Sequence, residues 1–158
     1  MVVTRAYTNV EAACERVLRS LPMWFGIEAS TLGYVADTSL LPTFVLIDGD
    51  DGNGEVTGFV TVKAHFRESH EITCIAVHAG HRMAGGGALL VAAAEQWSRD
   101  EGASFLQVKT LAPGANSAAY EQTRVFYKRM GFVPLEVFDT LLSPAHPCLQ
   151  LVKAIGPH

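Results

Sequence analysis

A glycine-rich segment in the middle of the chain has the composition of an anion-binding loop. It runs from Arg82 to Gly87, between an apolar stretch that ends at Val77 and a pattern of helical apolar spacing. Backbone N–H groups at the start of a helix lack partners within the helix, and the helix dipole adds partial positive charge there. Glycine lets an anion approach the backbone closely, and the Arg82 guanidinium suits a phosphate. The segment therefore predicts a binding site for a pyrophosphate.

Two common nucleotide-binding motifs do not fit this loop. A Walker loop ends in Gly-Lys-Ser or Gly-Lys-Thr, whereas this loop continues as Gly87-Ala88-Leu89. A dinucleotide fingerprint needs G-x-G-x-x-G directly after a strand, and Gly80 and Gly85 do not have that spacing. The pattern that fits is Arg-x-x-Gly-x-Gly, with Arg82, Gly85 and Gly87. A glycine-rich turn that binds no ligand is the alternative.

A second motif adds to a family resemblance. Phe126-Tyr127 is followed, after three residues, by Gly131-Phe132. With the Arg82–Gly87 loop, this motif resembles the GNAT superfamily of N-acetyltransferases, and the resemblance covers most of the chain. It is closest to a bacterial subgroup, on the segments Leu21-Pro22-Met23-Trp24-Phe25-Gly26, Val108-Lys109-Thr110-Leu111 and Thr123-Arg124-Val125-Phe126-Tyr127.

The resemblance implies acetyl-coenzyme A as the acyl donor. Main-chain amides of the loop would hold its pyrophosphate, and the strand Ile75-Ala76-Val77 would pair with its pantetheine arm. The implied cofactor contacts are Ile75, Ala76, Val77, Arg82, Met83, Ala84, Gly85, Gly86, Gly87, Ala88, Leu89, Tyr120 and Tyr127. Many family members have an Asn seven residues before the tyrosine of the second motif. This chain has Tyr120 there, and Asn116 does not align with that position.

Acetyl transfer to an amine requires a polarised carbonyl, a base for the amine and an acid for the thiolate. A main-chain amide near Val77 is the expected donor to the carbonyl. Tyr127 is the candidate acid, because a phenol and a thiol have similar pKa values; alternatively, its ring only packs under the cofactor. Glu71, expected at the start of a strand, is the candidate base, with a solvated charge as the alternative. His70 and His78 are alternative bases, because imidazole titrates near neutral pH.

The early aromatic residues Trp24, Phe25 and Tyr34 are candidates for the acceptor pocket, because the family builds part of that pocket from this segment. Ordinary packing is the alternative. His81, next to Arg82, is expected to flank the phosphates.

The order of predicted elements indicates a mixed α/β fold. Strand patterns cover residues 2–7, 42–47, 56–66, 71–77, 104–110, 132–138 and 148–154, and helical patterns cover 10–21, 84–101 and 117–130. Residues 23–41 read as irregular or weakly helical, and Thr8 or Asn9 is expected to cap the first helix. The resemblance implies a GNAT-like, mostly antiparallel sheet of about seven strands with about four helices, in a single domain over residues 1–158.

Composition excludes several classes of protein. The chain of 158 residues is 49% apolar and carries a net charge of −4, with no long basic run, so nucleic acid is not an expected partner. No apolar run reaches the ~18 residues of a membrane span, and no signal peptide is evident. Cys14, Cys74 and Cys148 lack metal-ligand spacing, which predicts no metal site and a cytoplasmic protein with reduced thiols.

We therefore expect an acetyl-CoA-dependent N-acetyltransferase that acts by direct attack in a ternary complex. The acceptor would be an amine of a small molecule or a peptide, and the family resemblance is compatible with a homodimer. A non-catalytic acyl-CoA-binding regulatory module is the alternative, and a structural α/β domain without a ligand is a third.

Overall fold

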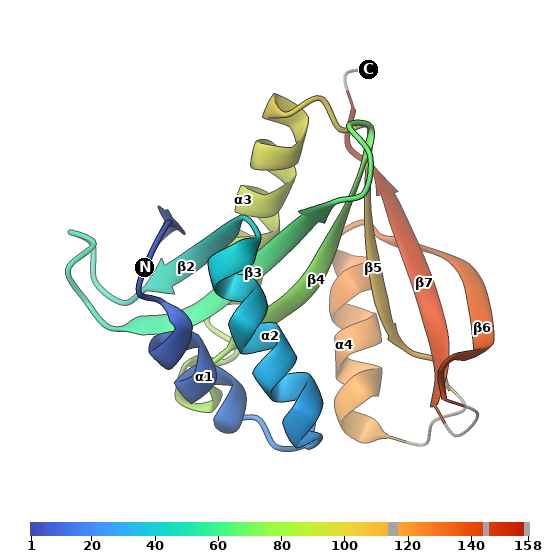
Figure 1. Cartoon of the computed structure of the whole chain (residues 1–158), viewed down its shortest axis with the longest axis horizontal. Helices are drawn as coiled ribbons and strands as arrows, with labels where there is room; N and C mark the ends of the chain where they lie inside the picture. The colour runs from blue at the N-terminus through green and yellow to red at the C-terminus, as the bar shows by residue number, and fades with distance from the viewer. Residues whose placement is uncertain (114–116, 144–145, 157–158) are drawn as a thin grey trace. The chain divides into compact units, whose positions relative to one another are not determined.

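A computed structural model describes residues 1–113, 117–143 and 146–156 and contains, within them, seven strands, four α-helices and one short 3₁₀ helix (Figure 1). The strand order is β1-β2-β3-β4-β5-β7-β6 in one sheet. This confirms the predicted mixed α/β architecture. In chain order, the elements are β1 (Val2–Ala6), α1 (Glu11–Arg19), α2 (Glu28–Leu40), β2 (Thr43–Ile47), β3 (Val56–Ala64), β4 (Ser69–Val77), η1 (Ala79–His81), α3 (Gly86–Asp100), β5 (Phe105–Leu111), α4 (Ala118–Arg129), β6 (Val133–Ser143) and β7 (His146–Ala154).

The chain divides into two compact units, and β4 contributes residues to both. One unit comprises Met1–Lys63 and Ile72–Trp97, and the other comprises Ala64–Glu71 and Ser98–His158. In the first unit, β1, β2 and β3 form an antiparallel meander. In the second unit, β7 pairs antiparallel with both β5 and β6.

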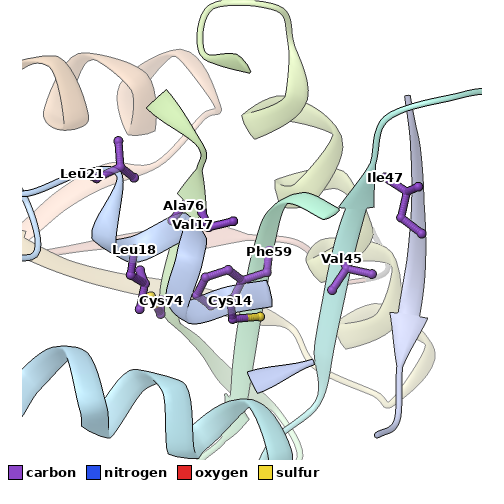
Figure 2. Packing of buried hydrophobic residues seen from close by; sticks show 9 residues of the cluster. All are labelled: Cys14, Val17, Leu18, Leu21, Val45, Ile47, Phe59, Cys74 and Ala76. Atoms are coloured by element: carbon purple, nitrogen blue, oxygen red, sulfur yellow. The ribbon is translucent and has the colours of Figure 1, made fainter. Parts of the chain in front are cut away.

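Strand β2 is buried on both of its faces. Since alternate side chains of a strand point to opposite faces, Phe44–Ile47 must be apolar throughout to pack against two layers. Val45 belongs to the core cluster that contains the α1 residues Cys14, Val17 and Leu18 (Figure 2). On the other face, the Phe44 ring centroid lies 6.3 Å from that of Trp97 on α3. Helices thus cover both faces of this part of the sheet.

One local prediction for the first unit is corrected by the structure. The N-cap of α1 is Val10, which makes no side-chain capping bond, so the expected cap by Thr8 or Asn9 is wrong. Asn9 instead has a φ of 60° and turns the chain between β1 and α1. It precedes the N-cap residue Val10, so it is not at the position from which a side chain caps the first helical N–H groups.

The segment predicted as irregular or weakly helical contains the 13-residue helix α2, next to α1 in Figure 1. Its Thr31 and Thr38 are buried, and Tyr34 and Val35 pack against the core cluster. Glu28 accepts hydrogen bonds from Arg19 at 2.7 and 2.9 Å. Since Gly, Ser and Thr are weak helix formers, packing rather than propensity stabilises this helix.

The second unit positions α4 against β5. The Ser117 side chain caps α4 by accepting from the Tyr120 N–H at 3.4 Å, and Gly131, with a φ of 95°, follows the helix end. Among the helices within the described ranges, none is both long and apolar enough to cross a membrane.

Candidate active site

Strand β4 carries its site residues on alternating faces. Ile72, Cys74 and Ala76 are buried, and Cys74 and Ala76 pack in the α1 core cluster. Because side chains alternate along a strand, Ile75 and Val77 lie on the opposite face from these two. Both are half-buried, in contrast to Cys74 and Ala76. The predicted pantetheine strand therefore has one face in the core and one face that is partly accessible.

The loop after β4 turns sharply into α3. Met83 and Gly85 have φ values of 65° and 88°, in the left-handed region, and Met83 is 94% exposed. A Cβ at Gly85 would meet no atom within 4 Å, so only its φ favours glycine. At Gly86, a Cβ would lie 2.5 Å from Leu46 Cδ2, so the start of α3 needs the smallest residue to approach β2.

The first turn of α3 leaves backbone donors unused. The N–H groups of Gly86, Gly87 and Ala88 have no hydrogen-bond partner in the described part of the chain. The Leu89 N–H bonds to the Gly85 carbonyl at 3.3 Å, which closes the turn. Ala88 and Gly85 are exposed, and Leu89 is 41% exposed. Gly87 is half-buried and Gly86 is buried. An unpartnered helix start of this kind suits an anion at its exposed side.

Arg82 stacks on an aromatic ring from the early segment. Its guanidinium carbon lies 4.2 Å from the centroid of the Trp24 ring. Trp24, Phe25 and Tyr34 all pack against the core cluster, and the Phe25 and Tyr34 rings meet edge-on at 5.9 Å. Trp24, a candidate for the acceptor pocket, thus contacts Arg82, the arginine that we expect to bind a phosphate. No spacing rule in the sequence connects the two.

Glu71 is the centre of a charged cluster in the second unit. Its Oε1 accepts from His65 Nε2 at 2.7 Å and from Lys109 Nζ at 3.0 Å. Glu71 is the third residue of β4, and its side chain is only 11% exposed. The expectation that Glu71 starts the strand, and the alternative of a solvated charge, are therefore both wrong. Sequence reasoning missed His65 and Lys109, because they come from the β3–β4 turn and from β5.

The predicted alternative bases have other partners. His70 is buried, its Nδ1 lies 3.0 Å from Ser98 Oγ, and burial lowers the pKa of His70, opposed by the charge of Glu101. His78 Nδ1 accepts from the Gly80 N–H at 3.1 Å, and the His78 and His81 rings lie 5.9 Å apart. The Nδ1 atoms of His70 and His78 are thus both engaged in hydrogen bonds within the protein.

The cysteines are buried thiols. Burial raises the pKa of Cys14 to about 12 and also raises the pKa of Cys74. For Cys148, burial is again the main cause of a raised pKa, with Lys109 acting in the opposite direction. Since the thiolate is the nucleophilic form, none of the three is prepared for covalent catalysis.

Tyr120 and Tyr127 lie on one face of α4, because seven residues make almost two helical turns. The Tyr127 side chain is buried, and its ring lies 5.5 Å from that of Phe126 and 5.7 Å from that of Phe132. Tyr120 is half-buried. The motif residues Tyr127 and Phe132 thus form one aromatic group at the end of α4.

The family model described as the acetyltransferase (GNAT) domain matches residues 41–134, more than half of the chain. The chain belongs to this family. The matched range of this GNAT domain contains the Arg82–Leu89 loop, the cluster around Glu71, and Tyr127, whereas Trp24, Phe25 and Tyr34 lie outside it. No curated protein sequence matches the chain.

Solved structures support the fold of this GNAT domain. A GNAT-family acetyltransferase from Desulfovibrio desulfuricans superposes with a TM-score of 0.83 at 16% identity, over 98% of each chain. An aminoglycoside 6′-N-acetyltransferase complexed with coenzyme A gives a TM-score of 0.78 at 17% identity, over 100% of this chain and 99% of the other. The ribosomal-protein-S18-alanine N-acetyltransferase of Escherichia coli gives a TM-score of 0.72 at 15% identity, over 99% of this chain and 96% of the other.

Proposed function

We propose that this GNAT domain transfers an acetyl group from acetyl-CoA to a primary amine of a small molecule or a peptide, by direct attack in a ternary complex. The observation that carries the proposal is the set of unpartnered N–H groups of Gly86, Gly87 and Ala88 beside Arg82. Such a helix start suits a pyrophosphate, and the aminoglycoside acetyltransferase with the same fold is complexed with coenzyme A.

The proposed donor site uses the contacts implied by the family. Main-chain amides from Arg82 to Ala88 hold the pyrophosphate, with Leu89 as a further contact, and the accessible face of Ile75–Val77 lies along the pantetheine arm. An N–H near Val77 donates to the thioester carbonyl as negative charge develops on its oxygen. Tyr120 and Tyr127, on one face of α4, complete the set of proposed contacts.

Three proton transfers accompany the acyl transfer. The acceptor ammonium loses one proton to the cluster around Glu71 and, after attack, a second proton to water, and the departing thiolate gains a proton from the Tyr127 hydroxyl. In between, the amine nitrogen forms the new C–N bond and the C–S bond breaks, which gives an amide and free CoA. The proton that Tyr127 donates is regained from solvent before the next turnover.

The proposed acceptor is a cationic amine in the cytoplasm. A net charge of −4 favours approach of a cation, and all three cysteines are free thiols, which suits a reducing compartment. We place Trp24, Phe25 and Tyr34 beside the acceptor path, with Trp24 also in contact with Arg82.

A thiol-release assay with acetyl-CoA and a panel of amines tests this function. The panel contains an aminoglycoside, a peptide with an N-terminal alanine and a polyamine, and mass spectrometry identifies the acetylated product. Turnover with at least one amine is expected. Calorimetric binding of acetyl-CoA without turnover across the panel would favour the regulatory acyl-CoA-binding module. Absence of binding would overturn both.

A further inference from the structure

We infer that His65 is the proton acceptor for the amine and that Glu71 positions it. This inference rests on the proposed function and assigns the proton transfer to one atom, Nδ1 of His65. In the step, the ammonium N–H bond of the acceptor breaks, directly or through a water molecule. Its proton then binds to His65 Nδ1, and the freed nitrogen lone pair attacks the carbonyl carbon of the thioester. The nitrogen loses its second proton to water as the C–S bond breaks, and the thiolate takes up the proton of the Tyr127 hydroxyl.

The hydrogen bond between His65 and Glu71 sets the tautomer of the ring. Nε2 of His65 lies 2.7 Å from Glu71 Oε1. A carboxylate accepts only, so Nε2 carries a hydrogen and, in the neutral ring, Nδ1 carries the lone pair. The described residues provide no partner for Nδ1. A carboxylate that fixes the tautomer and stabilises the imidazolium is the arrangement by which an acid–base histidine is prepared.

Lys109 keeps Glu71 from being the proton acceptor itself. Its ammonium lies 3.0 Å from Oε1, the same oxygen that His65 contacts. Protonation of Glu71 would leave the Lys109 charge without its counter-ion next to a carboxyl group that is largely removed from water. The proton is therefore better received on the ring, where the new positive charge faces the Glu71 anion.

Access to solvent also distinguishes the two residues. The His65 side chain is 32% exposed, whereas that of Glu71 is 11% exposed. His65 lies in the turn between β3 and β4, where its N–H donates to the Ser69 carbonyl at 3.1 Å. A proton received on Nδ1 can leave to water between turnovers, while the backbone bond fixes the turn and the bond to Glu71 holds the ring.

Two further titratable groups interact with this cluster. His70 interacts electrostatically with His65, and also with Glu101, whereas Cys148 interacts with both Lys109 and Glu71. His70 and Cys148 are buried, and burial favours the neutral form of each. The variants below therefore change His65 and Glu71 directly and leave His70 and Cys148 in place.

The pH dependence of kcat/KM is the central test, in the wild type, His65→Gln and Glu71→Gln. The wild type should lose activity on the acidic side as an imidazole becomes protonated. His65→Gln should lower kcat/KM about 100-fold or more and remove that acidic limb. Glu71→Gln should lower kcat/KM but keep the acidic limb, because the histidine remains while its hydrogen-bond acceptor is changed. Imidazole added to His65→Ala should restore part of the activity.

Controls separate this inference from the proposed function. His146→Gln, which removes another exposed histidine, should behave as the wild type. A wild type that acetylates amines and a His65→Gln variant with an unchanged acidic limb would overturn the inference alone. A wild type without turnover would overturn the proposed function. In that case ¹⁵N spectra of the histidines still test the hydrogen bond between His65 and Glu71. Identical His65 ring signals in the wild type and Glu71→Gln would overturn the positioning role of Glu71.

Discussion

The guanidinium of Arg82 lies over the indole ring of Trp24, with 4.2 Å between the guanidinium carbon and the ring centroid. This contact joins the loop before α3 to the segment between α1 and α2. A guanidinium stacked on a ring keeps its in-plane N–H groups available for hydrogen bonds. Trp24 therefore holds the side chain that we expect to contact a phosphate, in addition to packing at the margin of the core.

Replacement of Trp24 should weaken binding of the acyl donor. Trp24→Leu removes a cation–π contact worth about 0.5–1 kcal/mol at a partly exposed site, which corresponds to a rise in KM for acetyl-CoA of about two- to fivefold. kcat should change little, because the contact serves binding. Phe25→Leu is the matched control, since Phe25 packs on the same core. An equal KM in both variants would show that Trp24 acts only through packing.

The loop glycines should matter for different reasons. Gly86→Ala places a methyl group 2.5 Å from Leu46 Cδ2 and should lower both stability and donor affinity. Gly85→Ala meets no atom but must adopt a φ of 88°, at a cost of about 1–2 kcal/mol. Denaturant titration and calorimetry with CoA measure both effects.

Gly33→Ala is the control for these two variants. Its Cβ would meet nothing within 4 Å, and it lies inside α2 without a positive φ. It should stabilise the protein by up to about 1 kcal/mol and leave donor affinity unchanged. If Gly86→Ala bound CoA as well as Gly33→Ala does, the loop would not be the donor site.

The phenol of Tyr127 should matter for the rate. Tyr127→Phe keeps the ring contacts with Phe126 and Phe132 but removes the proposed acid, so kcat should fall about 100-fold while KM for acetyl-CoA stays nearly constant. Tyr120→Phe, on the same face of α4, should affect KM more than kcat. Steady-state kinetics distinguishes the two, and an unchanged kcat in Tyr127→Phe would indicate that the ring only packs.

The buried His70 should make the protein sensitive to mild acid. Because burial lowers its pKa in the folded state, the unfolded chain takes up a proton first as pH falls. The free energy of unfolding should therefore be constant above the ordinary pKa of histidine and decrease below it, towards pH 5. Urea titrations of the wild type and His70→Gln should show a shallower decrease in the variant, whereas His146→Gln should keep the wild-type slope. Equal slopes in all three proteins would contradict this role.

The cysteines should be unreactive while the protein is folded. Burial raises the pKa of the Cys14 thiol to about 12, so almost no thiolate is present at pH 8. A disulfide reagent should release little colour from the native protein and should titrate three thiols in denaturant. Rapid reaction of one thiol in the native protein would show that one of the three is more accessible than this structure indicates.

Features that depend on neighbouring residues were predictable from the sequence. The positive φ of Gly85 is a local property of the loop before α3, so glycine there could be expected from the sequence, whereas the need for Gly86 comes from its approach to Leu46 on β2. Tyr120 and Tyr127 share a face of α4 because helical periodicity alone places them there. The predicted strands were confirmed because their patterns are also local. A continuous apolar run indicates a strand buried on both faces, and alternation indicates a strand buried on one face.

Contacts between distant segments were decided by the tertiary structure. The sequence placed Glu71 on a strand but gave no sign that His65 and Lys109 share its Oε1, since these residues meet only when the β3–β4 turn and β5 pack together. In the same way, α2 is a helix because its buried side packs on the core, despite weak local propensity. Local conformation follows from φ, ψ and periodicity, whereas charge pairing and stacking follow from packing, which no local pattern encodes.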